Sequence, residues 1–168
     1  METLIQVLDE ESQEYEKLLG LSMKKTPVLV SGDLDELAKI TDEEQIVVSK
    51  INRLEQRRQE TFTDVANVIN KDVKTLMLGD LVEMLSSRPV EQQKLAKVHD
   101  RLRNVVREVK RVNEQNRELI ENALEMVEFD MNMLQAMKAA PETANYNRGA
   151  YNTGAQIGLN MGGFDAKQ

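Results

Sequence analysis

Histidine and cysteine, which often act as nucleophiles, general bases or metal ligands, are almost absent from this sequence, and its plentiful carboxylates fall on solvent faces at helical spacing. It contains no cysteine, and His99 is its only histidine. Carboxylate-bridged metal sites in helical bundles typically use Glu-x-x-His motifs, but the residue three positions before His99 is Ala96. Many glycines lie near the C-terminus, where no phosphate-binding loop follows a strand and opens a helix. We therefore predict no catalytic residue, no cofactor and no metal site, and we interpret His99 as a surface or boundary residue.

Charge and hydropathy exclude two further classes of partner. The formal net charge is −7, which gives no electrostatic reason to bind nucleic acid. The basic run from 94 to 111 has no interleaved aromatic residues. No stretch of about 18 apolar residues could span a membrane, and the acidic start lacks the features of a secretory signal. We expect a cytoplasmic protein with no nucleic-acid partner and no membrane insertion.

The composition favours thin layers of helix packed on helix. The chain has three Phe, three Tyr and no Trp, so leucine, valine, isoleucine and methionine must supply its core. These residues recur at helical spacing almost throughout. The predicted fold is all-α: an elongated antiparallel helical hairpin or coiled-coil-like bundle with a flexible C-terminal tail. It has three long helices and one short helix, at about residues 2–30, 33–70, 75–86 and 89–140, and a Gly- and Asn-rich tail at 141–168.

A few residues mark the helix ends. Pro27 should kink or end the first helix, because proline lacks an N–H group. Gly32 suits the left-handed conformation that closes a helix, and Asp33 with Glu36 resembles the capping box that opens the next one. Pro89 fits the first turn of the last helix. The short link at Gly32 predicts that the first two helices are antiparallel neighbours.

Charges support this hairpin. Acidic residues lie near the start of the first helix and basic residues lie late in the second, so antiparallel pairing brings opposite signs together: Asp9, Glu10, Glu11 and Glu14 against Lys50, Arg53, Arg57 and Arg58. The last helix also begins with basic residues, Lys94, Lys97, Arg101, Arg103 and Arg107. If it runs parallel to the first helix, its basic half meets the same acidic patch.

The last turns of the final helix are the candidate binding surface. In this register, residues 127–140 extend beyond the bundle with Val127, Phe129, Met131, Met133, Leu134 and Met137. Methionines there are either core filler or an adaptable surface for a partner helix. Apolar residues also recur in the tail, which a plain linker would not need. The predicted partner-binding residues are Leu119, Met126, Phe129, Met133, Met137, Tyr146, Tyr151, Ile157, Leu159 and Phe164.

Two asparagines share one turn of the last helix. Asn113 and Asn116 either polarise a buried seam and fix its register or face solvent. Together with the apolar residues that follow, they form the pattern Asn113-x-x-Asn116-x-x-Leu119-Ile120-x-x-Ala123-Leu124.

This pattern resembles the C-terminal signature of the FlgN-type flagellar export chaperones. The front of the chain is similar to the N-terminal hairpin of that family, in Glu14-Tyr15-Glu16-x-Leu18-Leu19, Leu29-Val30-x-Gly32-Asp33-Leu34-x-x-Leu37, Thr41-x-Glu43-Glu44-Gln45 and Leu54-Glu55-x-Arg57-Arg58. The resemblance covers roughly residues 4–137, and it is the order and spacing of the motifs that carry it.

The resemblance implies a chaperone that binds hook–filament junction (hook-associated) proteins and delivers them to the flagellar export apparatus. It also implies that the client binds the C-terminal part of the chain. The alternative is a structural coiled-coil adaptor that uses the same apolar stripe without releasing a client. Both are compatible with a monomer or a dimer, and neither is an enzyme.

Overall fold

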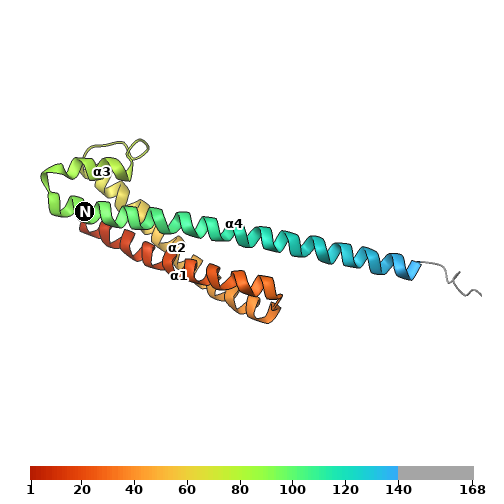
Figure 1. Cartoon of the computed structure of the whole chain (residues 1–168). Helices are drawn as coiled ribbons and strands as arrows, with labels where there is room; N and C mark the ends of the chain where they lie inside the picture. The colour runs from red at the N-terminus through yellow and green to blue at the C-terminus, as the bar shows by residue number, and fades with distance from the viewer. Residues whose placement is uncertain (140–168) are drawn as a thin grey trace, which may run out of the picture. The chain divides into compact units, whose positions relative to one another are not determined.

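The computed structural model describes residues 1–139, and all regular structure in this part is helical (Figure 1). The elements are α1 (Glu2–Ser31), α2 (Leu34–Val68), α3 (Leu78–Met84), a short 3₁₀ helix η1 (Leu85–Ser87) and α4 (Pro89–Ala139). The all-α prediction of three long helices and one short helix is therefore confirmed.

The chain divides into two compact units, with the boundary inside α4. The first unit is Met1–Glu125 and the second is Met126–Gln168. The structure describes the second unit only as far as Ala139, all of it helical. The predicted tail at 141–168 lies outside the described residues.

The turn between α1 and α2 forms as its residue types predict. Gly32 adopts a φ of 70°, in the left-handed region, and its N–H donates to the carbonyl of Val28 at 3.0 Å. The Asp33 carboxylate then accepts from the Glu36 N–H at 3.0 Å, which caps α2. The two helices lie side by side and antiparallel (Figure 1).

Pro27 does not end the first helix, because α1 continues through it to Ser31. A proline inside a helix leaves the carbonyl of the residue four positions earlier without its usual donor. Here that residue is Met23, which is exposed, so water can take the place of the missing N–H. The solvent-facing position explains why the helix does not end at Pro27.

The main core cluster joins all the helices at the end where α1 begins and α2 finishes. Its buried members are Leu4, Leu8, Ala66, Leu76, Leu81, Leu85 and Leu95. The short helix α3 contributes Leu81, which has 1% of its surface exposed. At its start, the Met77 N–H donates to the Asp80 carboxylate at 2.8 Å. The short helix thus packs on the bundle, an arrangement that the sequence leaves open.

A second cluster sets the course of α4 along the hairpin. Leu18, Val47, Ile51 and Val109 pack together, which joins α1, α2 and α4. Since Leu95 contacts the start of α1 and Val109 contacts its middle, α4 runs parallel to α1. The core of the first unit is therefore a three-helix arrangement with one helix antiparallel to the other two.

Ion pairs follow the charge pattern expected from this topology. Arg101 contacts Asp9 at 2.8 Å and Glu16 at 2.8 Å, which joins α4 to α1. Between α2 and α1, Arg57 contacts Glu10 at 3.3 Å. The Arg101 and Arg57 pairs are largely exposed, where an ion pair contributes about 0–1 kcal/mol. They bear on the register of the helices more than on stability.

Candidate functional site

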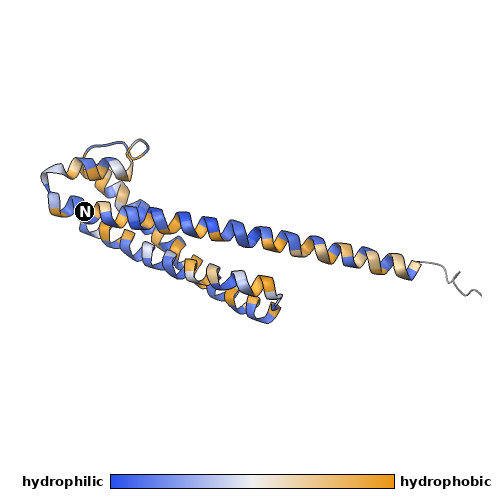
Figure 2. Cartoon of the chain, viewed as in Figure 1, coloured by the Kyte–Doolittle hydropathy of each residue, from blue (hydrophilic) through white to orange (hydrophobic). Residues whose placement is uncertain are grey.

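The exposed end of α4 differs sharply from its buried beginning. The buried residues of α4 are Leu95, Val105, Val109, Val112 and Asn116. From Ile120 to Ala139 every side chain is exposed, although apolar residues remain frequent. Figure 2 shows this apolar colouring on the C-terminal part of α4. Within the first unit, the exposed stretch already includes Ile120 and Leu124.

The described part of the second unit is dominated by one surface, which we call the α4 apolar face. Its large side chains are each 52–68% exposed: Met126, Val127, Phe129, Met131, Met133, Leu134 and Met137. Soluble proteins rarely expose a contiguous apolar patch of this kind unless it is an interaction site. The predicted residues Met126, Phe129, Met133 and Met137 all lie on it, while Leu119 in the first unit is half-buried.

Some parts of the predicted site cannot be placed. Tyr146, Tyr151, Ile157, Leu159 and Phe164 lie outside the described residues. The expected position of the last turns of α4 beyond the end of the bundle also stays a prediction. Exposure of the α4 apolar face is therefore the observation on which the candidate site rests.

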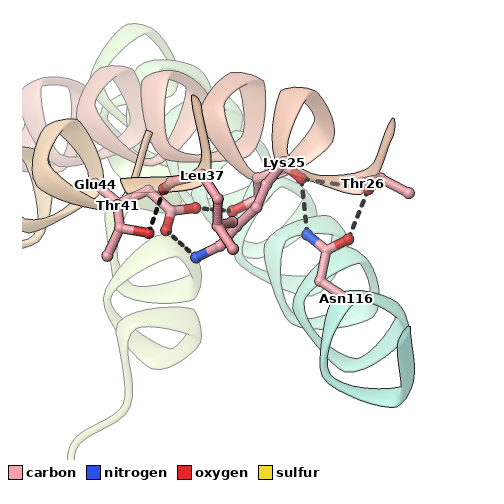
Figure 3. A network of polar contacts seen from close by, with 7 residues as sticks. Lys25, Thr26, Leu37, Thr41, Glu44 and Asn116 are labelled. Carbon is pink, nitrogen blue, oxygen red and sulfur yellow. Dashed lines mark hydrogen bonds and ion pairs between the residues drawn. The ribbon is translucent and has the colours of Figure 1, made fainter. Parts of the chain in front are cut away.

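A polar network marks the last buried turn of α4 (Figure 3). Asn116 is 4% exposed, and its side-chain amide donates to the carbonyl of Ser22 at 2.8 Å. The Thr26 hydroxyl donates to Asn116 Oδ1 at 2.7 Å. The sequence leaves open whether these asparagines lie in a buried seam or face solvent. Asn116 lies in the buried seam, and Asn113 faces solvent.

The same network continues from α1 to α2. Lys25 Nζ contacts Glu44 Oε2 at 2.7 Å, and the Ser22 hydroxyl donates to Glu44 Oε1 at 3.1 Å (Figure 3). Each of these polar groups gains a partner when it loses water, so burying it carries little penalty. The network fixes the register of α4 just before its side chains become exposed.

A buried carboxylate lies deeper in the first unit. Glu11 is 2% exposed, and its Oε2 atom lies 2.9 Å from Arg58 Nε. Burial raises the pKa of the Glu11 carboxyl above the ordinary 4.5, against the opposing charge of Arg58. Burial also raises the pKa of the neighbouring Tyr15 hydroxyl, and the Glu11 charge adds to that effect.

The Glu11 shift predicts a pH dependence of stability. Because the folded chain keeps this proton to a higher pH than the unfolded chain, the Glu11 contribution to the free energy of unfolding falls as pH rises from 4.5 through the raised pKa. Glu11→Gln removes that titration. We therefore expect the stability of the variant relative to the wild type to increase over this pH range, as measured by urea denaturation. A relative stability that stays constant or decreases with rising pH would contradict the assignment.

The described residues bring together no group with an evident chemical activity. Within 1–139, no cluster of three or more His, Cys, Asp or Glu side chains is arranged to hold a metal ion. His99 is half-buried beside Asp100, with 3.5 Å between Nδ1 and the carboxylate. None of the helices in this part of the chain is long and apolar enough to cross a membrane.

Sequence reasoning missed an apolar hollow at the other end of the first unit. It has a volume of about 540 Å³ and lies where α2 ends beside α3. Its wall holds Val65, Val68, Ile69, Leu81, Met84 and Leu85, together with polar and charged residues that include Asp64, Arg88 and Glu91. Leu81 and Leu85 also belong to the main core cluster, so the core reaches the surface there. A usable signal in the sequence is the apolar stripe of α2, which continues to Ile69.

Comparison with known proteins adds two findings. Residues 1–153 match the model of a protein family described as FlgN protein. A relative from Bacillus subtilis (strain 168), described as uncharacterized protein YvyG, is 27% identical over 133 residues, which span 79% of this chain and 76% of the relative. No solved structure matches.

Proposed function

This chain belongs to the FlgN protein family, and we propose that it is a cytoplasmic chaperone that binds hook–filament junction proteins before their export through the flagellar type III apparatus. The observation that carries the proposal is the exposed α4 apolar face. The family match, which covers the whole of α4, supports the same role.

The proposed mechanism is reversible masking of an apolar segment. A client helix with an apolar stripe would bury that stripe against the α4 apolar face, as in helix-in-groove recognition. Methionine side chains suit this task because they are flexible and can adapt to more than one packing arrangement. Binding needs no covalent step, so the client can be released when the export apparatus competes for it.

One substitution in the middle of the face tests the proposal. Met133→Glu places a charge where a client would exclude water, and we expect it to weaken binding of the junction-protein terminal segments more than 10-fold. The matched control is Gln135→Glu, which adds the same charge two residues away on the polar side of α4. Isothermal titration of the two full-length variants and the wild type against those segments measures the effect.

Each outcome of this titration separates the candidate functions. Equal binding by the two variants would show that the client binds somewhere other than the α4 apolar face. Absence of binding by all three proteins, together with self-association that Met133→Glu abolishes, would favour the structural adaptor. A chain ending at Ala140, checked for helicity by circular dichroism, tests the tail: weaker binding would assign part of the client site to residues 141–168.

A further inference from the structure

The α4 apolar face is wider than one partner helix can cover. In the heptad repeat of α4, Asp130 and Met137 occupy position a, and Met126 and Met133 occupy position d. The face extends past this a/d seam on both flanks, to Phe129 and Ala136 at g, Val127 and Leu134 at e, and Met131 at b. At 3.5 residues per turn these positions span roughly 200° of the circumference.

Three uncharged or acidic polar residues lie in the remaining strip. Glu128 and Gln135 occupy position f, and Asn132 occupies position c. A single helix in a coiled coil covers the a/d seam, whereas a helix that is apolar around more than half of its surface is normally enclosed from several sides. A single helix on the a/d seam would therefore leave the side chains on both flanks uncovered.

Two charged side chains interrupt this apolar surface, Asp130 in the a/d seam and Lys138 at the flank. Asp130 lies at position a, and its neighbours three and four residues away are Met126, Val127, Met133 and Leu134. It is exposed in the free chain, where water solvates the carboxylate. Once a partner covers the face, the same carboxylate loses water and needs a cation with good geometry. A polar residue at an a position also fixes the register of the pairing.

Charge argues against two other occupants of the face. An amphipathic helix that lies on an anionic lipid surface carries Lys and Arg on its polar side, whereas the strip opposite this face holds Glu128 and no basic residue among those described. A second copy of the chain, paired parallel and in register, would bring another Asp130 into the same seam. The only basic residue between Met126 and Ala139 is Lys138, at position b and outside the seam.

We propose that the α4 apolar face is enclosed by two helices of a partner chain, one of which places a lysine or arginine against Asp130. This inference rests on the proposed chaperone function and adds the chemistry of the client: two apolar helical stripes with a single basic residue in one of them. Asp130 is then the residue that selects the client and sets its register.

The charge pairing is tested by reversing two nearby charges in the full-length chain. Asp130→Lys puts like charges together in the covered seam, and we expect it to weaken binding of the junction-protein terminal segments more than 30-fold. Glu128→Lys makes the same charge change on the polar strip and should alter binding less than 3-fold. Replacing the basic residue of the client with glutamate should restore binding to Asp130→Lys. Similar binding by the two chaperone variants, or no rescue, would overturn the pairing.

The two-sided enclosure is tested on opposite flanks of the face. Phe129→Glu at position g and Met131→Glu at position b lie too far apart around the helix for one partner helix to contact both. We expect each to weaken binding more than 10-fold, with Gln135→Glu as the control. Sensitivity on one flank only would overturn the two-helix enclosure. If the wild type binds no junction segment, the proposed function and this inference both fail. If the wild type binds but the variants do not differ from their controls as expected, only this inference fails.

Discussion

Replacing Leu95 with alanine is expected to lower the free energy of unfolding by about 3 kcal/mol. Leu95 is 0% exposed and lies in the main core cluster, where α4 packs against Leu4 and Leu8 of α1 and Leu81 of α3. Truncation removes buried apolar contacts and leaves a cavity, because neighbours on three other elements cannot all move inward. Urea denaturation followed by far-ultraviolet circular dichroism measures the loss.

The same substitution at Leu124 supplies the matched control. Leu124 lies on the same helix but is 63% exposed, so Leu124→Ala should change the free energy of unfolding by less than about 0.5 kcal/mol. A small effect at both positions would mean that α4 does not pack on the α1–α2 hairpin in solution. A large effect at both would mean that Leu124 is covered, for example by a second copy of the chain.

The turns of this fold are predictable from sequence because their causes are local. At Gly32 the left-handed conformation, and at Asp33 the capping carboxylate, depend only on residues within one turn of the helix. The helix does not end at Pro27 for an equally physical reason. Proline propensity describes an isolated helix, but here the freed carbonyl belongs to an exposed residue and the helix continues.

The candidate site is predictable in part, because exposure depends on what the rest of the chain covers. Methionine at helical spacing is compatible with core filler or with an open surface, and the spacing alone does not decide between them. Asn116 is more accessible to sequence reasoning, since it continues the heptad phase of Val105, Val109 and Val112 whereas Asn113 does not. Its partners Ser22 and Thr26 could not be identified, because they depend on the register between distant helices.

Asn116→Asp is expected to destabilise the first unit by about 3 kcal/mol at neutral pH, although the two side chains have nearly the same shape. The new carboxylate could still accept from the Thr26 hydroxyl, but its other oxygen would face the carbonyl of Ser22 in place of a donor. Nearby, Lys25 already pairs with Glu44, so it is not available to neutralise the buried charge. Urea denaturation at neutral pH measures the loss.

Lowering the pH distinguishes this explanation from a general loss of packing. Burial beside the Ser22 carbonyl would raise the folded-state pKa of the introduced carboxyl above its unfolded value, so the penalty is fully present above the raised pKa and decreases as pH falls toward the unfolded pKa. Asn113→Asp, on the exposed side of the same turn, should cost less than about 0.5 kcal/mol at any pH. If the loss of unfolding free energy in Asn116→Asp does not shrink as pH falls, the amide of Asn116 contributes through its shape. If that loss shrinks as pH falls, Asn116 is the polar contact that fixes α4 in register.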